Sequence, residues 1–458
     1  MIVDPKDQKS PLSHYLFKAE AIKRFFDVAE KGITLLNSYF IISSLSVFSF
    51  GLYQLILSFI SIVRGLGVNF FDGMVTLDMR RYFNVQKRDL AKKLFQENIF
   101  FKIAAGIIMA IAVFLGADII ANLYGQQIAS LLKWSSILLV TSAFQSLAGI
   151  FLQSVISFSQ RGFSALREIL KLGLIIFFLS FYQFTISEVI IAHVIAETIT
   201  TIALSLFVFI KKYPQAFRGV TASIQPLMVP MVKTHGRYVF VSFGLKEVLQ
   251  DSAPWLVKFF LNTESVALYS LAVNLTSFIQ DFMPLTGLRP ILALKADNLK
   301  ELAFVFTRTV KYMLWLGILF LVVSFFAVPP TIGLLFPNYL PAIPAFLAMS
   351  LSFPLYGVMK AIAIVLASLR EYKTLAMRLF NEVLILFGGS ALLLPTVGVV
   401  GVGLVYLARL IERTWFLYYK LVKSRPEFRV KLKNLFVFDK TDKQFIRSFL
   451  SFVYRKRA

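Results

Sequence analysis

The most constraining feature of the sequence is the alternation of charged and uncharged connections between long apolar segments. The chain has 458 residues, of which 57% are hydrophobic and 48 are Lys or Arg. Between about twelve apolar segments, every second connection is rich in Lys and Arg, while the others hold almost none. A soluble domain instead spreads polar side chains along the chain to cover its surface. The alternation therefore predicts a polytopic membrane protein.

Each apolar segment is long enough to cross the hydrocarbon layer as a helix. A layer of about 30 Å requires about 20 helical residues. A backbone at that depth must satisfy its own hydrogen bonds, so we expect helices rather than open strands. The predicted spans cover residues 30–48, 50–76, 99–122, 134–157, 165–185, 187–210, 238–261, 265–288, 312–335, 343–367, 375–395 and 398–419.

The distribution of basic residues predicts the orientation of the chain. About 40 of the 48 lie near the two termini or in the even-numbered connections, which share one side of the membrane. The positive-inside rule makes that side cytoplasmic, so we expect both termini in the cytoplasm of a multi-pass cell-membrane protein. A basic face beside anionic lipid headgroups explains the net charge of +23, and we expect no nucleic-acid partner.

A short internal repeat indicates two lobes. The segment GLYQL at 51–55 resembles ALYSL at 267–271, and each opens an even-numbered span. The shift moves the chain by six spans, so the halves keep the same orientation and are related by an axis along the membrane normal. We predict an all-α fold of about 12 transmembrane helices in two six-helix lobes. The expected parts are a cytoplasmic or interfacial segment (1–28), an N-lobe (29–210), a cytoplasmic linker (211–237), a C-lobe (238–419) and a basic amphipathic cytoplasmic tail (420–458).

Charged residues inside the spans are candidate functional residues, because each costs roughly 2.5–3.5 kcal/mol at a helix centre. Arg64 lies in the second span, and we expect Asp72, eight residues later, to share roughly its face. Arg64 has no acidic residue one turn away in the sequence. Arginine suits phosphate groups because its fork presents several donors and stays charged. The pattern favours an anionic substrate.

The seventh span carries a polar stripe at helical spacing. Glu247, Asp251, Pro254 and Lys258 follow steps of three and four residues, and Lys246 precedes them. We expect this stripe to face water or the other lobe. Pro254 removes a backbone donor and predicts a kink.

Other charges have two interpretations each. Arg409, Glu412 and Arg413 form either a structural network or a ligand site, and His193 with Glu197 forms either a hydrogen-bonded structural pair or a proton-coupling pair. Arg289 and Lys360 either snorkel to the interface or bind substrate. The candidate substrate-binding residues are Arg64, Lys246, Lys258, Arg289, Lys360 and Arg409, and the candidate ion-coupling residues are His193, Glu197, Glu247 and Asp251.

Several loose motifs along the chain match one transporter family. They are FGLYQL at 50–55, continuing through GLG at 65–67 to RRY at 80–82, then ALYSL at 267–271, LLFPNY at 334–339, and Asn381 with GVVGVG at 398–403. With these motifs the sequence resembles the Wzx-type polysaccharide and O-antigen flippases of the multidrug/oligosaccharidyl-lipid/polysaccharide exporter superfamily.

The resemblance implies a V-shaped, two-lobe protein that moves a polyprenyl-pyrophosphate-linked glycan between leaflets by alternating access. It implies a cationic central cavity for the headgroup, with the lipid tail left in the bilayer, and no cofactor. The first span departs from the lipid II flippases of the superfamily, since it lacks an Arg-Asp pair at mid-depth and has only Glu30-Lys31 near its cytoplasmic end. This departure argues against a peptidoglycan precursor as the substrate.

Three alternatives remain open. A cation-coupled multidrug exporter of the same superfamily shares the architecture, but its cavity is expected to be acidic. A major-facilitator carrier also has six-plus-six spans, and its loop signature is only faintly matched at 73–81. A membrane-bound glycan polymerase or ligase is disfavoured by the short, nearly uncharged outer connections. We expect no enzyme activity, since the three His residues are widely separated, Cys is absent, and no nucleophile–base pair is evident.

The basic tail alternates charge with apolar residues. We expect residues 420–458 to lie along the cytoplasmic headgroups as an amphipathic anchor, the alternative being a docking site for a glycan-assembly protein. The expected partners are therefore the lipid-linked glycan and membrane lipids.

Overall fold

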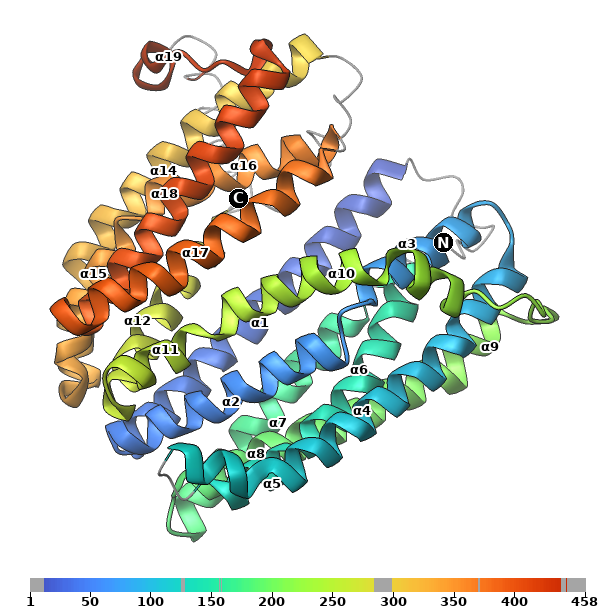
Figure 1. The fold of residues 1–458 in the computed structure, drawn as a ribbon, viewed down its shortest axis with the longest axis horizontal. Helices are drawn as coiled ribbons and strands as arrows, with labels where there is room; N and C mark the ends of the chain where they lie inside the picture. Colours follow the sequence, from blue (N-terminus) through green and yellow to red (C-terminus); the bar gives the residue numbers. More distant parts are fainter. Residues whose placement is uncertain are drawn as a thin grey trace, which may run out of the picture. The chain divides into compact units, whose positions relative to one another are not determined.

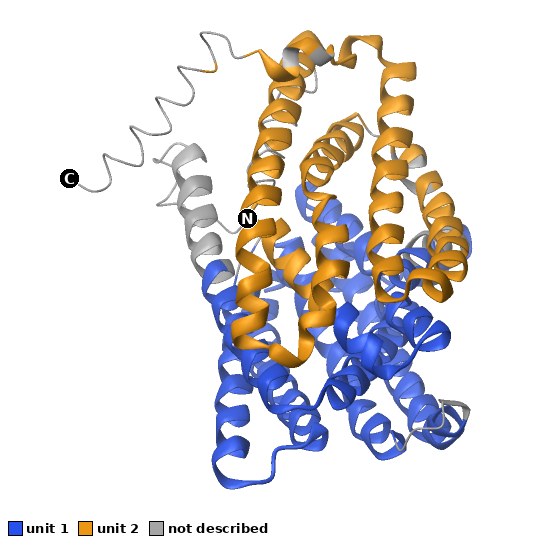
Figure 2. Cartoon of the chain, turned by 90° about the vertical axis from the view of Figure 1, so that its left-hand side faces the viewer, with its two compact units in different colours: residues 1–270 blue, residues 271–458 orange. Residues whose placement is uncertain are grey.

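The protein folds into helices that form two compact units. The computed structural model describes residues 12–124, 128–155, 157, 159–283, 299–369, 371–437 and 442, and every regular element among them is helical. Contacts divide the chain into residues 1–270 and residues 271–458 (Figure 2). The predicted all-helical fold class is therefore confirmed for the described residues.

The first unit contains the helices of the N-terminal half (Figure 1). They are α1 (Leu12–Ser44), α2 (Val47–Gly67), α3 (Asp72–Asn84), α4 (Arg88–Tyr124), α5 (Ala129–Ser135), α6 (Ile137–Ser154), α7 (Gln160–Phe181), α8 (Ile186–Leu206), the π-helix η2 (Phe207–Lys212), α9 (Tyr213–Ala216), α10 (Met228–Asp251), α11 (Ala253–Phe260) and the start of α12 (Thr263–Asp281).

An aromatic core joins α4, α6 and α9 in this unit. Phe95 and Phe151 are fully buried with ring centroids 5.3 Å apart. Tyr213 and Phe217 pack in the same cluster, and their own ring centroids lie 5.0 Å apart. Aromatic pairs at such distances add about 0.5–1.5 kcal/mol beyond the burial of their area. The cluster thus packs α4 and α9 against α6, which lines the candidate site described below.

The second unit contains the rest of α12 and the helices that follow. They are α14 (Leu299–Leu335), the 3-10 helix η3 (Pro337–Ala342), α15 (Ile343–Ser350), α16 (Phe353–Ser368), α17 (Tyr372–Val397), α18 (Val399–Ser424), the 3-10 helix η4 (Pro426–Phe428) and α19 (Leu432–Phe436).

Six helices or helix runs in the described residues are both long and apolar enough to cross a membrane. The bent pair Pro337–Ser350 and Phe353–Ser368, which meets at 46°, makes a seventh if it forms one broken span. The remaining predicted spans coincide with α1, α7, α10 with α11, α12 and α18, which are more polar. For example, α7 carries Arg167, Glu168 and Lys171. Most of these more polar helices carry the polar networks described below.

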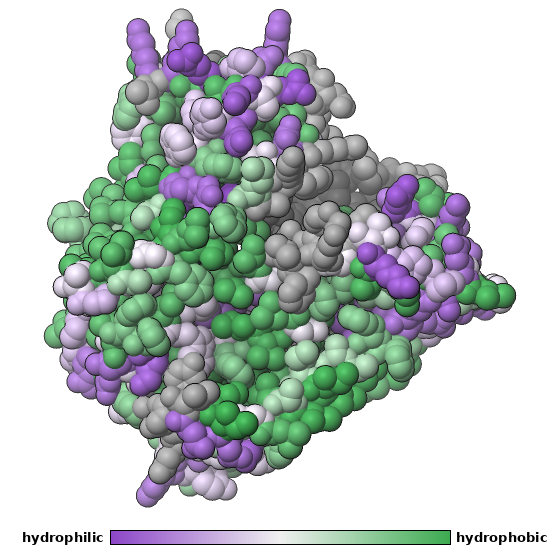
Figure 3. Space-filling view, in the orientation of Figure 1, coloured by the Kyte–Doolittle hydropathy of each residue, from purple (hydrophilic) through white to green (hydrophobic). Residues whose placement is uncertain are grey.

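The outer face of α4 is suited to contact lipid. Side chains along its second half are exposed and apolar, and a green band covers this part of the first unit in Figure 3. Because lipid tails are as apolar as these side chains, such a surface needs no protein partner in a bilayer. The exposed residues are Ile107, Ile108, Ile111, Phe114, Leu115 and Ile119.

The second predicted span is interrupted. The sequence predicted one helix over 50–76, but α2 ends at Gly67 and α3 begins at Asp72. The backbone N–H groups of Val68 and Asn69 both donate to the carbonyl of Arg64, which closes the helix end. The expectation that Arg64 and Asp72 share one helix face is therefore wrong.

The internal repeat has a structural counterpart. Gly51 and Ala267 each lie four residues after the first residue of their helices, which begin at Val47 and Thr263. The two helix starts are thus related by the same shift as the two sequence segments. Tyr53 and Tyr269, the matching aromatic residues, are 4% and 7% exposed, so both serve as core residues.

The predicted linker packs against the first unit. Lys92 donates to the carbonyl of Val220 at 2.7 Å, and Glu97 accepts from the backbone N–H groups of Leu227 and Met228 at 2.9 and 2.7 Å. The contacts therefore divide the chain within α12 rather than at residues 211–237. The lobe boundaries inferred from the repeat remain a prediction.

The N-terminal segment forms no separate interfacial helix in the described residues. The sequence predicted a separate cytoplasmic or interfacial segment over 1–28, but α1 runs without interruption from Leu12 to Ser44. The first span is therefore the C-terminal part of a longer helix.

Part of the C-terminal tail folds back onto α14. Phe428 is fully buried and its ring lies 5.5 Å from that of Phe306. Trp315 donates to the carbonyl of Leu435 at 2.9 Å, and Lys311 pairs with the buried Asp442 at 2.6 Å. The apolar residues Phe428 and Leu435, expected to face lipid headgroups, lie instead in the core of the second unit.

The contact between α14 and α16 depends on a glycine. A Cβ added at Gly317 would lie against the carbonyl oxygen of Phe353 and 2.6 Å from Pro354 Cα, and both are backbone atoms. We expect Gly317→Val to destabilise the protein by about 1–3 kcal/mol or more, because the helices must separate. Thermal unfolding in detergent measures the effect.

The matched control is Gly333→Ala in the same helix. Its Cβ would lie 3.7 Å from the nearest atom, a side-chain carbon of Leu340, which is ordinary contact. We expect this variant to unfold at the wild-type temperature or slightly above it. Equal unfolding temperatures for Gly317→Val and the wild type would contradict the close-packing argument.

Candidate functional site

A polar cavity of about 540 Å³ lies within the first unit, between the end of α2, α3, α6 and the start of α7. Its wall combines two arginines and one aspartate with neutral amides and hydroxyls. The lining residues are Arg64, Asn69, Asp72, Gly73, Thr76, Leu77, Arg80, Ser142, Gln145, Ser146, Gly149, Ile150, Gln153 and Gln160.

The carboxylate in this cavity is neutralised by a buried lysine. Lys102 on α4 is 0% exposed, pairs with Asp72 and donates to the carbonyl of Val68 at 2.5 Å. Ser146 donates to the other oxygen of Asp72 at 2.5 Å. Asp72 also lies in the first turn of α3, where the helix dipole favours a negative charge. The lysine thus joins α4 to the break between α2 and α3.

The cavity is left with an excess of positive charge from Arg64 and Arg80. Arg80 donates to the carbonyl of Gln153 at 2.8 Å, which places its guanidinium beside α6. Arg64 lies in the last turn of α2 and contacts Ser61 at 3.4 Å. Guanidinium groups with spare donors beside uncharged amides and hydroxyls suit an anionic, hydroxyl-rich ligand.

Arg64 also faces the acidic stripe of α10. Ser61 donates to Asp251 at 2.7 Å, and Ser58 donates to the backbone carbonyl of the same residue. A Cβ at Gly65 would lie 2.7 Å from Glu247 Cβ, so only a glycine allows this approach of the two helices. The acidic neighbours of Arg64 therefore come from another helix, where the sequence showed none on its own.

Lys246 lies near the same acidic residues, Glu247 and Asp251. Its ammonium lies 3.7 Å from Glu247, and its side chain is 51% exposed. Arg64 and Lys246 both act electrostatically on Glu247 and Asp251. Arg64 and Lys246 therefore lie in the same unit and act on the same two carboxylates, and their role in substrate binding stays a prediction.

The predicted break at Pro254 is confirmed. α10 ends at Asp251, α11 begins at Ala253, and Pro254 lies in its first turn, where its missing N–H costs no hydrogen bond. The stripe faces α2 through Glu247 and Asp251. Lys258 lies at the end of α11 and is half-buried.

The other predicted sites are dispersed. Lys360 lies in α16 with its ammonium 5.3 Å from the ring centroid of Tyr356, a cation–π contact. Arg409 lies in α18 beside Glu382, at 3.6 Å. Arg289 lies outside the described residues.

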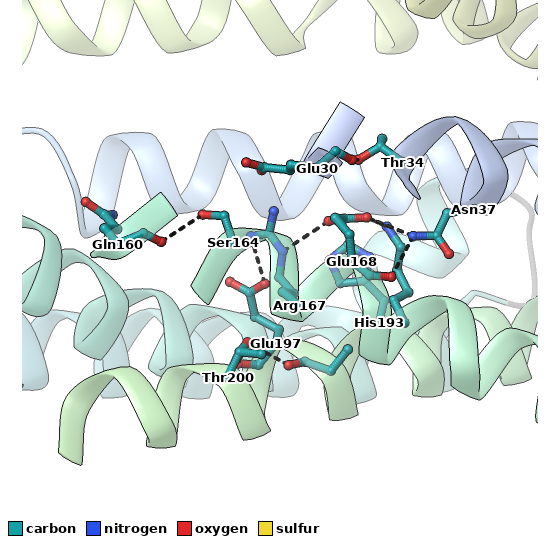
Figure 4. A network of polar contacts seen from close by, with 12 residues as sticks. Glu30, Thr34, Asn37, Gln160, Ser164, Arg167, Glu168, His193, Glu197 and Thr200 are labelled. Carbon is teal, nitrogen blue, oxygen red and sulfur yellow. Dashed lines mark hydrogen bonds and ion pairs between the residues drawn. The ribbon is translucent and has the colours of Figure 1, made fainter. Parts of the chain in front are cut away.

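A charged network joins α1, α7 and α8 in the first unit (Figure 4). Arg167 contacts Glu168 at 3.1 Å and Glu197 at 3.2 Å, and Lys171 contacts Glu168 at 2.8 Å. Asn37 donates to both the backbone and side-chain oxygens of Glu168 at 3.0 Å. Both bases are thus paired with buried glutamates, which supports a structural role for the network.

His193 and Glu197 do not form the pair that the sequence suggested. His193 Nδ1 lies 3.4 Å from the hydroxyl of Tyr53 on α2, while Glu197 binds Arg167. Both side chains belong to the network in Figure 4, but to different parts of it. The i, i+4 spacing placed them on one helix face and gave no sign of the partners from α2 and α7.

The network predicted within α18 also involves different partners. Glu412 accepts a hydrogen bond from Asn381 at 2.8 Å, while Arg409 and Arg413 face Glu382 of α17. Arg378, which lies in the predicted span 375–395 but was not among the candidate residues, joins them from α17. The sequence contained one sign of this ion-pair network, because Arg378 and Glu382 lie one turn apart on the same helix.

Three solved structures of membrane transporters resemble this chain. The lipid II flippase MurJ in an inward closed conformation matches with a TM-score of 0.71 and 15% identity, covering 90% of this chain and 89% of MurJ. An inward-facing multidrug resistance MATE transporter of the MOP superfamily matches with a TM-score of 0.67 and 13% identity, covering 86% and 96%. The chain has the fold of these membrane transporters.

The match covers nearly the whole chain, so the all-helical polytopic fold with 12 spans in two lobes is confirmed. A Pyrococcus furiosus MOP superfamily transporter, described as having a binding pocket of reverse polarity, matches with a TM-score of 0.58 and 12% identity, covering 88% and 93%. No protein-family model matches the sequence, and no curated protein matches it. The narrower resemblance to Wzx-type flippases remains a prediction.

Proposed function

We propose that the protein is a flippase for a polyprenyl-pyrophosphate-linked oligosaccharide or polysaccharide repeat unit. The observation that carries this proposal is the cavity around Arg64 and Arg80, whose single carboxylate is already paired with Lys102. A pyrophosphate that leaves water needs fixed positive partners. The surrounding amides and hydroxyls are donors and acceptors of the kind that bind sugar hydroxyls.

Two structural neighbours agree with this assignment in different ways. MurJ is a flippase of lipid II, and it shares the fold over 90% of this chain. The Pyrococcus furiosus transporter shares the fold and has a pocket of reverse polarity. The fold is therefore compatible with a lipid-linked substrate and with binding pockets of more than one polarity.

In the proposed mechanism, alternating access exposes the headgroup site first to the cytoplasm and then to the outer side. Arg64 and Lys246 hold the pyrophosphate, and the lipid tail stays in the bilayer. Glu247 and Asp251 compete for the same two bases, so ion or proton binding at these acids would free the bases for substrate. The charge distribution supports termini in the cytoplasm, and the basic tail would then lie near lipid headgroups or a glycan-assembly protein.

A cation-coupled multidrug exporter is the second candidate, because MATE transporters share the fold. Glu247 and Asp251 supply the acidic groups that a cationic drug needs. The wall of the cavity, however, carries two arginines. Among the described residues that line it, Asp72 is the single carboxylate. Since Asp72 is bound to Lys102, the two arginines leave the wall of the cavity with an excess of positive charge, which favours the flippase.

A transport measurement with two substrates separates these candidates. The purified protein is reconstituted in proteoliposomes that contain a polyprenyl-pyrophosphate-linked glycan, and a parallel preparation is loaded with a cationic dye. We expect protein-dependent exposure of the glycan on the opposite leaflet and no dye efflux above protein-free vesicles. Dye efflux without glycan exposure would replace the flippase by the drug exporter.

A further inference from the structure

The second unit contains a cluster of three arginines around one glutamate, which we call the arginine cluster: Arg378, Glu382, Arg409 and Arg413. Glu382 on α17 is 4% exposed. Its carboxylate lies 3.7 Å from Arg378 Nε, 3.6 Å from Arg409 Nη2 and 3.4 Å from Arg413 Nε. Three guanidinium groups thus converge from two helices on a single buried carboxylate.

The ion pairs in the arginine cluster are long and leave donors unused. Among the described residues, Nε and Nη1 of Arg378 and Nε of Arg413 are buried without a hydrogen-bond partner, and so is Oε1 of Glu382. A carboxylate with good geometry would accept paired N–H groups at about 2.7–2.9 Å. Glu382 therefore shields the three charges without satisfying their hydrogen-bonding capacity.

Among the residues that the structure describes, the arginine cluster has more bases than acidic neighbours. Glu412 is the second acid nearby, and it accepts its hydrogen bond from Asn381 at 2.8 Å. Within the described part of the chain, Arg378, Arg409 and Arg413 then face two glutamates. Asp281 and Lys360, which lie around Tyr356 beside Arg413, add one charge of each sign. A net positive charge in a membrane-spanning region is costly unless an anion or water compensates it.

The donor geometry selects the kind of anion. Each guanidinium presents a planar fork of N–H groups that matches two oxygens of a phosphate or carboxylate. A halide offers no paired acceptors for these forks. The hydroxyl of Tyr406, bonded to Gln280 at 3.0 Å and influenced by Arg409 and Arg413, adds a neutral polar group at the edge of the cluster.

We propose that the arginine cluster is a second anion site, which binds a phosphate-class oxyanion. The ligand's oxygens take the unused donors of Arg378 and Arg413, and Glu382 is the internal competitor for the same charges. The oxyanion is either a free inorganic phosphate or pyrophosphate or the headgroup of a lipid. This proposal does not depend on the proposed flippase activity, because anion binding is measured on the protein alone.

The test is the affinity of inorganic pyrophosphate for the purified full-length protein in detergent, measured by calorimetry at constant ionic strength. We expect Arg378→Gln and Arg413→Gln each to weaken binding about tenfold, since each removes a charge-assisted hydrogen bond. Glu382→Gln removes the competitor and is expected to tighten binding. A purely structural network predicts no such gain.

The matched control is Arg425→Gln, which changes the same kind of side chain at an exposed position after α18 in the same unit and leaves the arginine cluster intact. Its pyrophosphate affinity at the second site is expected to equal that of the wild type. Unchanged affinity in Arg378→Gln, Arg413→Gln and Glu382→Gln would overturn the proposal. Thermal unfolding of each variant confirms the fold, and Arg413→Lys supplies a charge-conserving variant that is expected to retain partial binding.

A competition arm identifies the source of the oxyanion. Polyprenyl pyrophosphate is added to the micelles while inorganic pyrophosphate is titrated. Competition that Arg378→Gln abolishes assigns the site to a lipid headgroup. Absence of competition, with binding of the inorganic ion retained, assigns it to a free anion from the aqueous phase.

Discussion

Replacing Arg64 with alanine is expected to slow glycan flipping by about 10- to 100-fold, the cost of losing one charge-assisted hydrogen bond to the substrate. Arg64 is one of two arginines in the wall of the cavity, and its guanidinium has only a 3.4 Å contact with Ser61 among the hydrogen bonds of the described residues. The measurement is the rate of leaflet exposure of a polyprenyl-pyrophosphate-linked glycan in proteoliposomes.

Two control variants separate substrate binding from folding. Arg218→Ala removes the same side chain from an exposed position between α9 and α10, and we expect it to flip at the wild-type rate. Arg64→Lys keeps the charge without the fork, and we expect an intermediate rate. If Arg64→Ala inserts and unfolds like the wild type and still flips at the same rate, Arg64 does not bind the headgroup.

Replacing Lys102 with methionine is expected to destabilise the protein by about 3–5 kcal/mol, because it leaves the charge of Asp72 buried and unpaired. Lys102 is 0% exposed and also holds the carbonyl of Val68 at the break between α2 and α3. The loss of both contacts should release α3 from α4. Thermal or denaturant unfolding in detergent measures the change in the free energy of unfolding.

The double variant Lys102→Met with Asp72→Asn tests whether the unpaired carboxylate of Asp72 causes the loss of stability. If the stranded carboxylate dominates, the double variant is more stable than Lys102→Met alone. Lys93→Met serves as the control on the same helix, since Lys93 forms an i, i+4 pair with Glu97 at 3.3 Å. Such pairs contribute about 0.2–0.5 kcal/mol, so little change is expected. A Lys102→Met variant as stable as Lys93→Met would contradict the structural role.

Much of the fold follows from patterns that are local in the sequence. Segment length and apolar content place each span, because a helix in lipid must satisfy its own backbone. The break at Pro254 follows from its missing N–H, and α11 begins beside it. The interruption after Gly67 was not predictable in this way, because it is stabilised by Lys102, which comes from a different helix, α4.

The candidate site was only partly predictable, because most partners of a buried charge lie on other helices. Spacing within α2 identified Arg64 but gave no sign of Asp251, which reaches Ser61 from α10. Spacing within α8 joined His193 to Glu197, whereas Arg167 of α7 is the partner of Glu197. Arg80 and Arg378 were not among the candidate residues, although the structure places Arg80 in the wall of the cavity and Arg378 in the arginine cluster.

The packing of the C-terminal tail could also not be predicted from its own sequence pattern. Phe428 and Leu435 alternate with basic residues, a pattern typical of a membrane-surface segment. The surface of α14 provides a protein alternative to lipid, with Phe306 under Phe428 and Trp315 bonded to the backbone of Leu435. Amphipathic pattern alone does not distinguish these two apolar partners.

The central claim is that the protein moves a lipid-linked glycan by recognising its anionic pyrophosphate. The most direct measurement compares, in wild-type proteoliposomes, the leaflet exposure of one glycan attached either through a pyrophosphate or through a neutral lipid linkage. The account predicts protein-dependent flipping of the pyrophosphate-linked form at least about tenfold faster than of the neutral form. Equal rates for the two linkages, or no flipping of the pyrophosphate-linked form, would contradict it.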